Sequence, residues 1–179
     1  DSYGFIWIGT WKGLFRYDGY DVINFSVINR RFNALKIEEI IINGNDLWVG
    51  SFVTGLFKIN LENYEVTHYL KDNEDNHRIS DNNIISLCAA PDNNIFVGTE
   101  RGGLCVINPE GKVAKIYSPE THPNILRTRQ ISKITYLRDN TIVVGNNGLT
   151  FFNYKTEEAK MYTYPGLEYF ISDMLRIND

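Results

Sequence analysis

The chain has 179 residues, of which 43% are hydrophobic and 22% charged, and its formal net charge is −4. This length suits one domain with a substantial core, and the composition excludes a disordered chain. No apolar run approaches the roughly 20 residues that a transmembrane helix needs, so we expect no direct membrane insertion. The basic residues do not cluster, which argues against nucleic-acid binding, because displacing condensed counterions takes a basic stripe.

The chain begins with a pattern that returns three times. The first copy, "GFIWIGTWKGLFRYD" at residues 4–18, places two apolar bursts around a loop bracketed by glycines. The later copies are "NDLWVGSFVTGLFKIN" (45–60), "NNIFVGTERGGLCVIN" (93–108) and the more divergent "NTIVVGNNGLTFFN" (140–153). One glycine closes each first burst, at intervals of 41, 48 and 47 residues: Gly9, Gly50, Gly98 and Gly145. Such a period is typical of propeller blades or helical repeats.

The pattern inside each copy indicates strands. The segments are short and rich in β-branched and aromatic residues, and aromatic residues make up 13% of the chain, which suits half-buried sheet surfaces. Asn-Gly, Asp-Asn and Gly-Gly pairs separate the segments, as is typical of hairpin turns. The sequence therefore predicts an all-β fold of propeller blades, each with four antiparallel strands.

About four blades' worth of strands follow one another along the chain. We predict a blade at 1–26 that lacks its first strand, complete blades at 37–70, 84–118 and 131–164, and the first strand of a next blade at 171–179. The strands expected in the complete blades are 37–42, 46–51, 56–60 and 65–69, then 84–90, 95–99, 104–108 and 113–117, then 131–137, 141–145, 149–153 and 159–162. We expect an open arc whose exposed edges favour self-association, with a self-closed four-bladed ring as the alternative.

Several residues are expected to serve the structure alone. The four glycines named above allow close backbone approach, and a second set supplies the hairpin turns: Gly13, Gly55, Gly103 and Gly148. The repeated position of Trp7 and Trp48 places both in the core. Cys88 and Cys105 are predicted to be buried free thiols on strands that are not neighbours.

The first copy, "D-x-x-G-x-I-W-I-G-T-x-x-G-L-x-R-Y-D" at residues 1–18, resembles the two-component regulator propeller repeat. The resemblance covers essentially the whole chain, and the second and third copies match it well. The fourth copy departs from it, with Val143 in place of tryptophan and a shorter loop at Asn146 and Asn147. WD40 repeats differ, because they require a Gly-His pair and a terminal Trp-Asp that this sequence does not have.

This resemblance implies a sensor region of a hybrid two-component system, located in the periplasm and attached to the inner membrane. In that family the sensor resembles two seven-bladed propellers and a further β domain, followed by a membrane helix, a histidine kinase, a receiver and a DNA-binding region. The chain would then be a fragment of a larger seven-bladed propeller. The resemblance further implies that the full sensor recognises an oligosaccharide, and that binding changes its conformation.

Candidate ligand contacts lie in the loops between the second and third strands, which propeller topology places on one face with the connections between blades. Sugars bind by stacking on aromatic rings and by hydrogen bonds to planar polar groups, and loops on a rigid scaffold commonly carry function. The candidates are Trp11, Lys12, Phe52, Glu100, Arg101, Asn146 and Asn147. The alternative is that these are ordinary solvated turn residues.

No pattern indicates catalysis. The histidines at 68, 77 and 122 lack metal-ligand spacing, no GxSxG elbow is present, and each Gly-x-x-x-Gly lies in a hairpin rather than a phosphate loop. We therefore expect no catalytic residue, metal or cofactor, and no enzyme activity in this chain. A polysaccharide-active lyase or glycosidase and a protein-interaction scaffold are the alternative functions.

Overall fold

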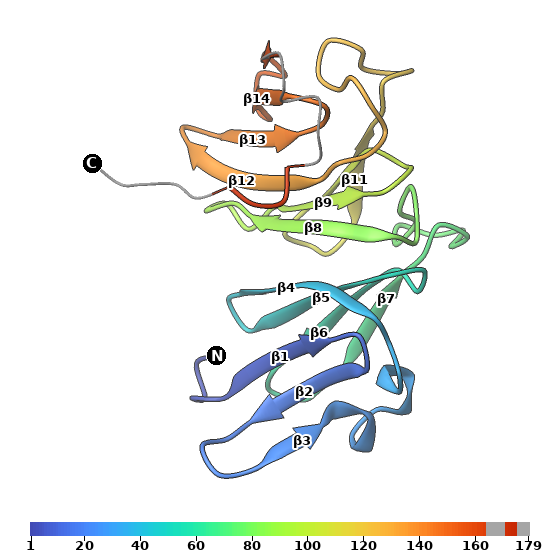
Figure 1. Ribbon diagram of the computed structural model, residues 1–179, viewed down its shortest axis with the longest axis vertical. Coiled ribbons are helices and arrows are strands. Elements are labelled where there is room, and N and C mark those ends of the chain that lie inside the picture. The colour runs from blue at the N-terminus through green and yellow to red at the C-terminus, as the bar shows by residue number, and fades with distance from the viewer. Residues whose placement is uncertain (164–170, 175–179) are drawn as a thin grey trace.

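Four antiparallel sheets follow one another along the chain, each made of consecutive strands (Figure 1). The computed structural model describes residues 1–163 and 171–174. The first sheet has the order β1-β2-β3, and each of the other three has four strands in sequence order. The strands are β1 (Ile6–Thr10), β2 (Gly13–Tyr17), β3 (Val22–Asn24), β4 (Ile37–Asn43), β5 (Asp46–Ser51), β6 (Leu56–Asn60), β7 (Val66–Tyr69), β8 (Ile84–Ala89), β9 (Ile95–Thr99), β10 (Leu104–Ile107), β11 (Val113–Tyr117), β12 (Lys133–Arg138), β13 (Thr141–Gly145), β14 (Leu149–Asn153) and β15 (Ala159–Tyr162).

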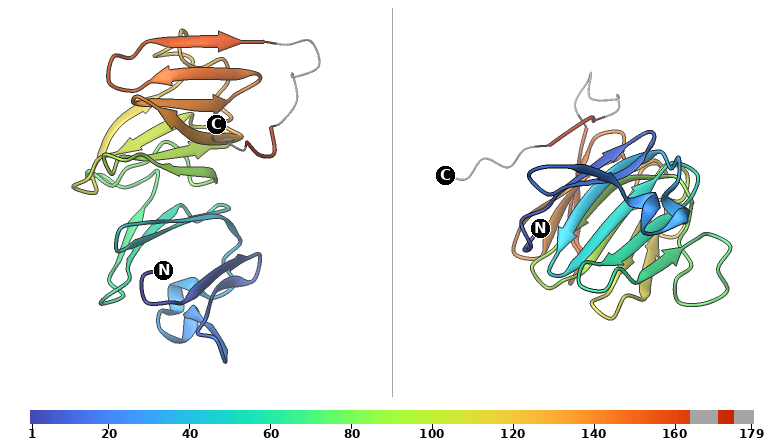
Figure 2. Two further views of the ribbon diagram at one scale, coloured as in Figure 1. Left: turned by 90° about the vertical axis from the view of Figure 1, so that its left-hand side faces the viewer. Right: turned by 90° about the horizontal axis from the view of Figure 1, so that it is seen from below.

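Each sheet is a propeller blade, numbered one to four in chain order, which confirms the predicted fold class. The blades stack in an arc, with blade 1 and blade 4 at opposite ends (Figures 1 and 2). Strand β8 contacts both β4 and β12, so the first strands of blades 2, 3 and 4 form the inner edge of the arc.

The strands lie within two residues of their predicted positions. The largest difference is at β12, which begins at Lys133 rather than at residue 131, because Ile131 donates its backbone N–H to Thr99 O of blade 3 at 2.9 Å. Residues 171–174 of the strand predicted at 171–179 lie in no strand. The remainder of that prediction, and residue 164 of the last complete blade, lie outside the described residues.

Two short 3₁₀ helices that the sequence did not suggest connect blades 1 and 2, η1 (Phe25–Val27) and η2 (Arg30–Phe32). The side chain of Asn24 accepts a hydrogen bond from Ser26 N, and that of Asn29 accepts one from Arg31 N, which stabilises each helix start. Each helix buries its phenylalanine, and the two rings meet edge to face at 5.1 Å. The connection at residues 25–32 therefore packs into the core through Phe25 and Phe32 and is not only a polar loop. We call this segment the 3₁₀ plug.

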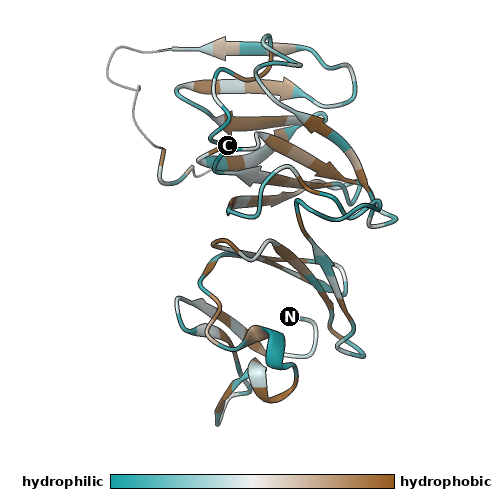
Figure 3. Cartoon of the chain, turned by 90° about the vertical axis from the view of Figure 1, so that its right-hand side faces the viewer, coloured by the Kyte–Doolittle hydropathy of each residue, from teal (hydrophilic) through white to brown (hydrophobic). Residues whose placement is uncertain are grey.

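The hydrophobic core lies between the blades. One cluster joins blades 1 and 2, a second joins blades 2 and 3, and a third joins blades 3 and 4. Figure 3 shows hydrophobic colours along the strands and hydrophilic colours in many of the loops. Trp7 lies in the first cluster and Trp48 in the second, which confirms that both belong to the core.

A glycine and an isoleucine fix the spacing of successive blades. A Cβ built on Gly9 would lie 2.6 Å from Ile37 Cγ2 of the next blade, and one on Gly50 would lie 2.7 Å from Ile84 Cγ2. A Cβ built on Gly98 would likewise lie 2.7 Å from Ile131 Cγ2, and one built on Gly145 would lie 3.2 Å from Ile171 Cδ1. We call each of these contacts a glycine notch. The predicted close approach at all four glycines is confirmed.

The two cysteines are free and buried, as predicted. Cys88 lies on β8 and Cys105 on β10, and β9 separates these strands in the sheet. Burial raises the pKa of Cys88 to about 11, and burial likewise raises the pKa of Cys105.

Candidate functional site

The loops that join the second and third strands of blades 1, 2 and 3 are held by a repeated internal hydrogen bond. Thr10 Oγ1 donates to Gly13 O at 3.0 Å, Ser51 Oγ to Gly55 O at 2.6 Å, and Thr99 Oγ1 to Gly103 O at 2.8 Å. Gly55 and Gly103 adopt φ values of +83° and +87°, which glycine tolerates without strain. Each loop therefore presents its middle residues on a fixed base.

Trp11 and Phe52, the two aromatic candidates, come from adjacent blades and line one shallow hollow of about 220 Å³. Trp11 lies between β1 and β2 and is 72% exposed, whereas Phe52 follows β5 and is 39% exposed. These rings are accessible to a ligand, unlike Trp7 and Trp48, and the hollow gives them a common floor.

Two charged residues complete the lining of the Trp11–Phe52 hollow. They are Lys36, directly before β4, and Glu38, within β4. Lys36 Nζ lies 5.5 Å from the centre of the Phe52 ring, and Lys36 O accepts a hydrogen bond from Phe52 N at 2.9 Å. The hollow thus combines flat apolar surfaces with one positive and one negative group.

Glu100 and Arg101 lie together on the equivalent loop of blade 3. Glu100 Oε2 accepts a hydrogen bond from Asn83 Nδ2 at 2.6 Å and lies 3.7 Å from Arg101 Nε. Arg101 donates its backbone N–H to Asp81 Oδ2 at 2.8 Å, and its side chain is largely exposed. Asn83 also accepts a hydrogen bond from Val53 N at 2.7 Å, and this bond links the loops of blades 2 and 3.

The remaining candidates are placed separately. Lys12 is exposed beside Trp11, and its backbone N–H donates to Thr10 Oγ1. Asn147 is exposed, with a φ of +62°. Asn146 differs from the expectation, because its side chain is buried and its Oδ1 accepts a hydrogen bond from Thr150 Oγ1 at 3.1 Å. Asn146 directly follows its notch glycine, as Ser51 and Thr99 do in blades 2 and 3, and those two side chains are buried as well.

A row of polar side chains follows the inner edge of the arc, two residues after each isoleucine of the glycine notches: Glu39, Ser86, Lys133 and Asp173. Lys133 Nζ lies 2.9 Å from Glu39 Oε2 and 3.5 Å from Asp173 Oδ1. Burial lowers the pKa of Lys133, but its hydrogen bond with Glu39 and the two carboxylate charges outweigh burial and leave that pKa above its usual value. We call these four residues the inner polar row.

Sequence reasoning missed Lys36, Glu38, Asn83 and the inner polar row. Lys36 and Asn83 directly follow two connections that the repeat pattern did place on the ligand face. Each residue of the inner polar row lies two positions after an isoleucine that packs against a notch glycine. This spacing can be recognised only after the structure has shown which isoleucines make that contact.

The structure adds two observations on the classes of function considered. Among residues 1–163 and 171–174, no three His, Cys, Asp or Glu side chains group in a way that could hold a metal ion. Within the same residues, no helix has the length and apolar character required to cross a bilayer.

Comparison with known proteins supports the repeat assignment. The family model described as "two component regulator propeller" matches residues 78–101, which confirms the resemblance at the third blade. A search of curated proteins found no match.

Solved structures share the fold. The extracellular domain assigned to the hybrid two component system BT3049 from B. thetaiotaomicron has a TM-score of 0.73 at 17% identity, over 91% of this chain and 22% of that chain. The corresponding domain of BT4673 from the same organism gives 0.71 at 24% identity, over 92% and 21%. The WD40 repeats of RRP9 give 0.64 at 8% identity, over 89% and 48%. The chain spans about a fifth of the length of the two extracellular domains.

Proposed function

We propose that the chain is a ligand-sensing propeller segment of an extracytoplasmic, periplasmic sensor in a hybrid two-component system, and that its ligand is an oligosaccharide. The match to the regulator propeller at residues 78–101 supports the sensor assignment, together with the fold shared with two such extracellular domains. The chain acts by binding and not by catalysis. Kinase activity would belong to other parts of a longer protein.

The Trp11–Phe52 hollow is the observation that carries the proposed ligand class. Two exposed aromatic rings from neighbouring blades share one hollow with an ammonium and a carboxylate group. The rings offer flat surfaces to the C–H faces of sugar rings, and Lys36 and Glu38 offer a donor and an acceptor to hydroxyl groups. Glu100 and Arg101 on the next blade extend this polar surface for a longer chain of sugars.

A ligand that signals must bind one conformation of the sensor better than another. The Trp11–Phe52 hollow lies between two blades, so a ligand seated there contacts both and favours one relative position of the two. Blade-to-blade geometry is thus the conformational variable that binding would change.

Titration with defined oligosaccharides tests this proposal, and the chain provides its own reporter. Of its three tryptophans, Trp7 and Trp48 are buried, and Trp11 is exposed, so a change in fluorescence on binding reports on Trp11. We expect Trp11→Phe to keep the affinity measured by calorimetry while losing the fluorescence change. Trp11→Ala and Phe52→Ala should each weaken binding about tenfold or more, which corresponds to about 1.4 kcal/mol.

The matched control is Tyr20→Ala, which removes an aromatic side chain that is 93% exposed. Tyr20 lies in the turn after β2, whereas Trp11 lies in the loop before β2. This variant should bind like the original chain. Equal affinity of Trp11→Ala and the original chain would contradict the hollow as the site. Release of new reducing or unsaturated ends during the titration would contradict the non-enzymatic assignment.

A further inference from the structure

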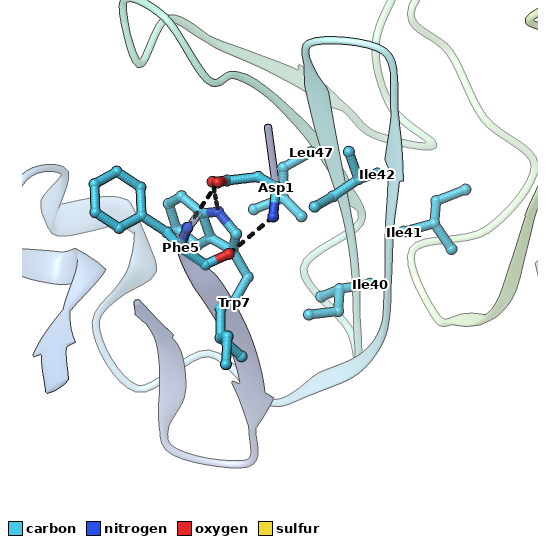
Figure 4. Close-up of a pocket in the computed structure, with 8 residues that line it drawn as sticks. Asp1, Phe5, Trp7, Ile40, Ile41, Ile42 and Leu47 are labelled. Atoms are coloured by element: carbon cyan, nitrogen blue, oxygen red, sulfur yellow. Dashed lines mark hydrogen bonds between the residues drawn. The ribbon is translucent and has the colours of Figure 1, made fainter. Parts of the chain in front are cut away.

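The hollows between blades 1 and 2 differ in chemistry. The hollow beside β1, of about 340 Å³, is lined by apolar side chains of β1 and of the β4–β5 hairpin, together with Asp1 and Phe5 (Figure 4). The Asp1 carboxylate accepts hydrogen bonds from Phe5 N and Trp7 Nε1, at 2.9 and 2.6 Å. A ligand rich in hydroxyl groups therefore finds more polar partners in the Trp11–Phe52 hollow, which is formed by loops.

The loop that carries Phe52 also contains a strained residue. Val53 has a φ of +64°, in the left-handed region that crowds a β-branched side chain. Among the residues that the structure describes, it is the one β-branched residue with a positive φ. Strain of this kind persists only where the surroundings hold it, and it is concentrated at functional sites. The bonds around Val53 therefore indicate what keeps the ring of Phe52 in its place.

The hydrogen bond that holds Val53 comes from outside its own blade. Val53 N donates at 2.7 Å to Oδ1 of Asn83, which directly precedes β8 of blade 3. The other end of the same amide donates from Nδ2 to Glu100 Oε2 at 2.6 Å. A backbone N–H only donates and an ionised carboxylate only accepts, so these partners fix which end of the amide faces which loop. One asparagine thus ties the loop of Phe52 in blade 2 to the loop of Glu100 in blade 3.

The equivalent position between blades 1 and 2 holds a residue of different chemistry. Lys36 and Asn83 each directly precede the isoleucine of a glycine notch, and their carbonyl oxygens accept hydrogen bonds from Phe52 N and Glu100 N, at 2.9 and 3.0 Å. A lysine side chain cannot accept a hydrogen bond, so it cannot bridge two loops as the amide does. Lys36 lines the Trp11–Phe52 hollow instead. The gap between blades 1 and 2 therefore keeps its hollow, whereas Asn83 spans the gap between blades 2 and 3.

We propose that Asn83 is a positioning residue of the binding surface, which holds the Trp11–Phe52 hollow and Glu100 in one arrangement for a single ligand. This inference rests on the proposed function and names a residue that would set its affinity. The acceptor of the amide offsets the strain of Val53 and so fixes the loop of Phe52, while its donor fixes the carboxylate of Glu100. A ligand then meets both surfaces without first ordering them, and such preorganisation increases affinity.

Hydrogen exchange of backbone amides, followed by NMR without any ligand, tests the positioning. The informative amides are those of Phe52 and Gly55, because they donate to Lys36 O and Asn82 O, two acceptors that a substitution of Asn83 leaves in place. In Asn83→Ala both amides should exchange about tenfold faster or more, since the strained residue between them is then free to leave its left-handed conformation. The amides of β9 should keep their rates, which would show that blade 3 stays folded.

Two further variants separate this role from a general loss of stability. Val53→Asn added to Asn83→Ala should restore most of the protection, because asparagine adopts the left-handed conformation several-fold more often than most residues that carry a side chain. Asn83→Asp keeps an acceptor for Val53 N but places a second carboxylate beside Glu100. In this variant the amide of Phe52 should stay protected, whereas that of Glu100 should exchange faster.

Asn63→Ala is the matched control. The amide of Asn63 has the same two kinds of partner, since it accepts from Glu65 N at 2.9 Å and donates to Glu65 Oε2 at 3.2 Å, but it lies in the turn between β6 and β7. Its removal should change none of the exchange rates measured above. Unchanged exchange in Asn83→Ala would overturn the inference, as would a loss of protection that Val53→Asn does not restore.

Affinity provides the second measurement, with defined oligosaccharides of two to six sugar units as the probes. Asn83→Ala should weaken binding about tenfold, and Val53→Asn in the same chain should restore most of it, whereas Asn63→Ala should bind like the original chain. Equal affinity of Asn83→Ala and the original chain would overturn the inference. Failure of the original chain to bind any of these probes would count against the proposed function, and the exchange rates would then still decide whether Asn83 positions the loops.

Discussion

Blades 1 and 2 carry nearly the same repeat but differ in what surrounds them. Ile6 and Ile8 on β1 correspond to Leu47 and Val49 on β5, counted back from Gly9 and Gly50. The blade 2 residues are fully buried, because blade 1 lies against them, whereas the blade 1 residues are exposed. The comparison teaches that a repeat encodes the shape of a blade, while its neighbours decide how much each residue contributes to stability.

The largest expected effect comes from truncating the same repeat position in the two blades. Leu47→Ala should lower the free energy of unfolding by about 2–5 kcal/mol, as is usual for a buried leucine. Ile6→Ala should change it by about 0.5 kcal/mol or less in the monomer, since that side chain is mostly exposed. Urea unfolding of both variants measures the difference, and equal losses would contradict the neighbour explanation.

A second contrast compares a glycine notch between complete blades with the one at the end of the arc. Gly98→Ala places a Cβ against the backbone and Cγ2 of Ile131, and overpacking of this kind costs about 1–3 kcal/mol. Gly145→Ala meets the ends of two side chains, Ser132 and Ile171, and should cost less. Thermal unfolding tests the order, and Ile131→Ala should partly rescue Gly98→Ala if the clash is the cause.

A smaller effect is expected from the inner polar row. Lys133→Met leaves the half-buried carboxylate of Glu39 without its partner and should cost about 1 kcal/mol at neutral pH. The control Arg129→Met breaks an exposed pair with Glu120 and should cost close to nothing. Since the folded-state pKa of Lys133 is raised, its contribution is complete below the usual value of 10.5 and is lost as pH rises beyond it. A Lys133→Met effect that does not fade at high pH would contradict this account.

The smallest expected effect is the reaction of Cys88 and Cys105 with a thiol reagent, which tests whether blade 3, packed between two other blades, shields its buried thiols from solvent. Burial raises the pKa of both thiols, so at pH 8 both are protonated and should react slowly with a thiol reagent. Two equivalents per chain should react promptly in guanidinium chloride. Rapid reaction of either thiol in the native protein would show that the blade opens.

The fold could be predicted because its determinants repeat. The notch glycines and the turn glycines return at the same places in every copy, and Trp7 and Trp48 share one position in two copies, so their spacing predicted blades and strands. The 3₁₀ plug that carries Phe25 and Phe32 occurs once, between blades 1 and 2, and the repeat therefore gave no sign of it.

The candidate site was less predictable. Trp11 and Phe52 were found because they are the aromatic residues of the loops between second and third strands, but their joint hollow depends on how two blades pack. Asn146 follows its notch glycine directly, where blades 2 and 3 bury Ser51 and Thr99, so its burial reflects its place in the repeat. Asn83, which donates a hydrogen bond to Glu100, comes from a connection between blades whose path the sequence pattern does not specify.

The inner polar row separates two kinds of information within one strand. Ile37, Ile84, Ile131 and Ile171 are the same residue because each fills a notch, whereas the residues two positions later are a glutamate, a serine, a lysine and an aspartate. The spacing of the blades and the chemistry of the arc's inner edge thus depend on different sequence positions. A protein engineer could replace Glu39, Lys133 and Asp173 and keep the glycine notches, whereas Ser86 is buried and its Oγ accepts a hydrogen bond from Ile134 N of the next blade.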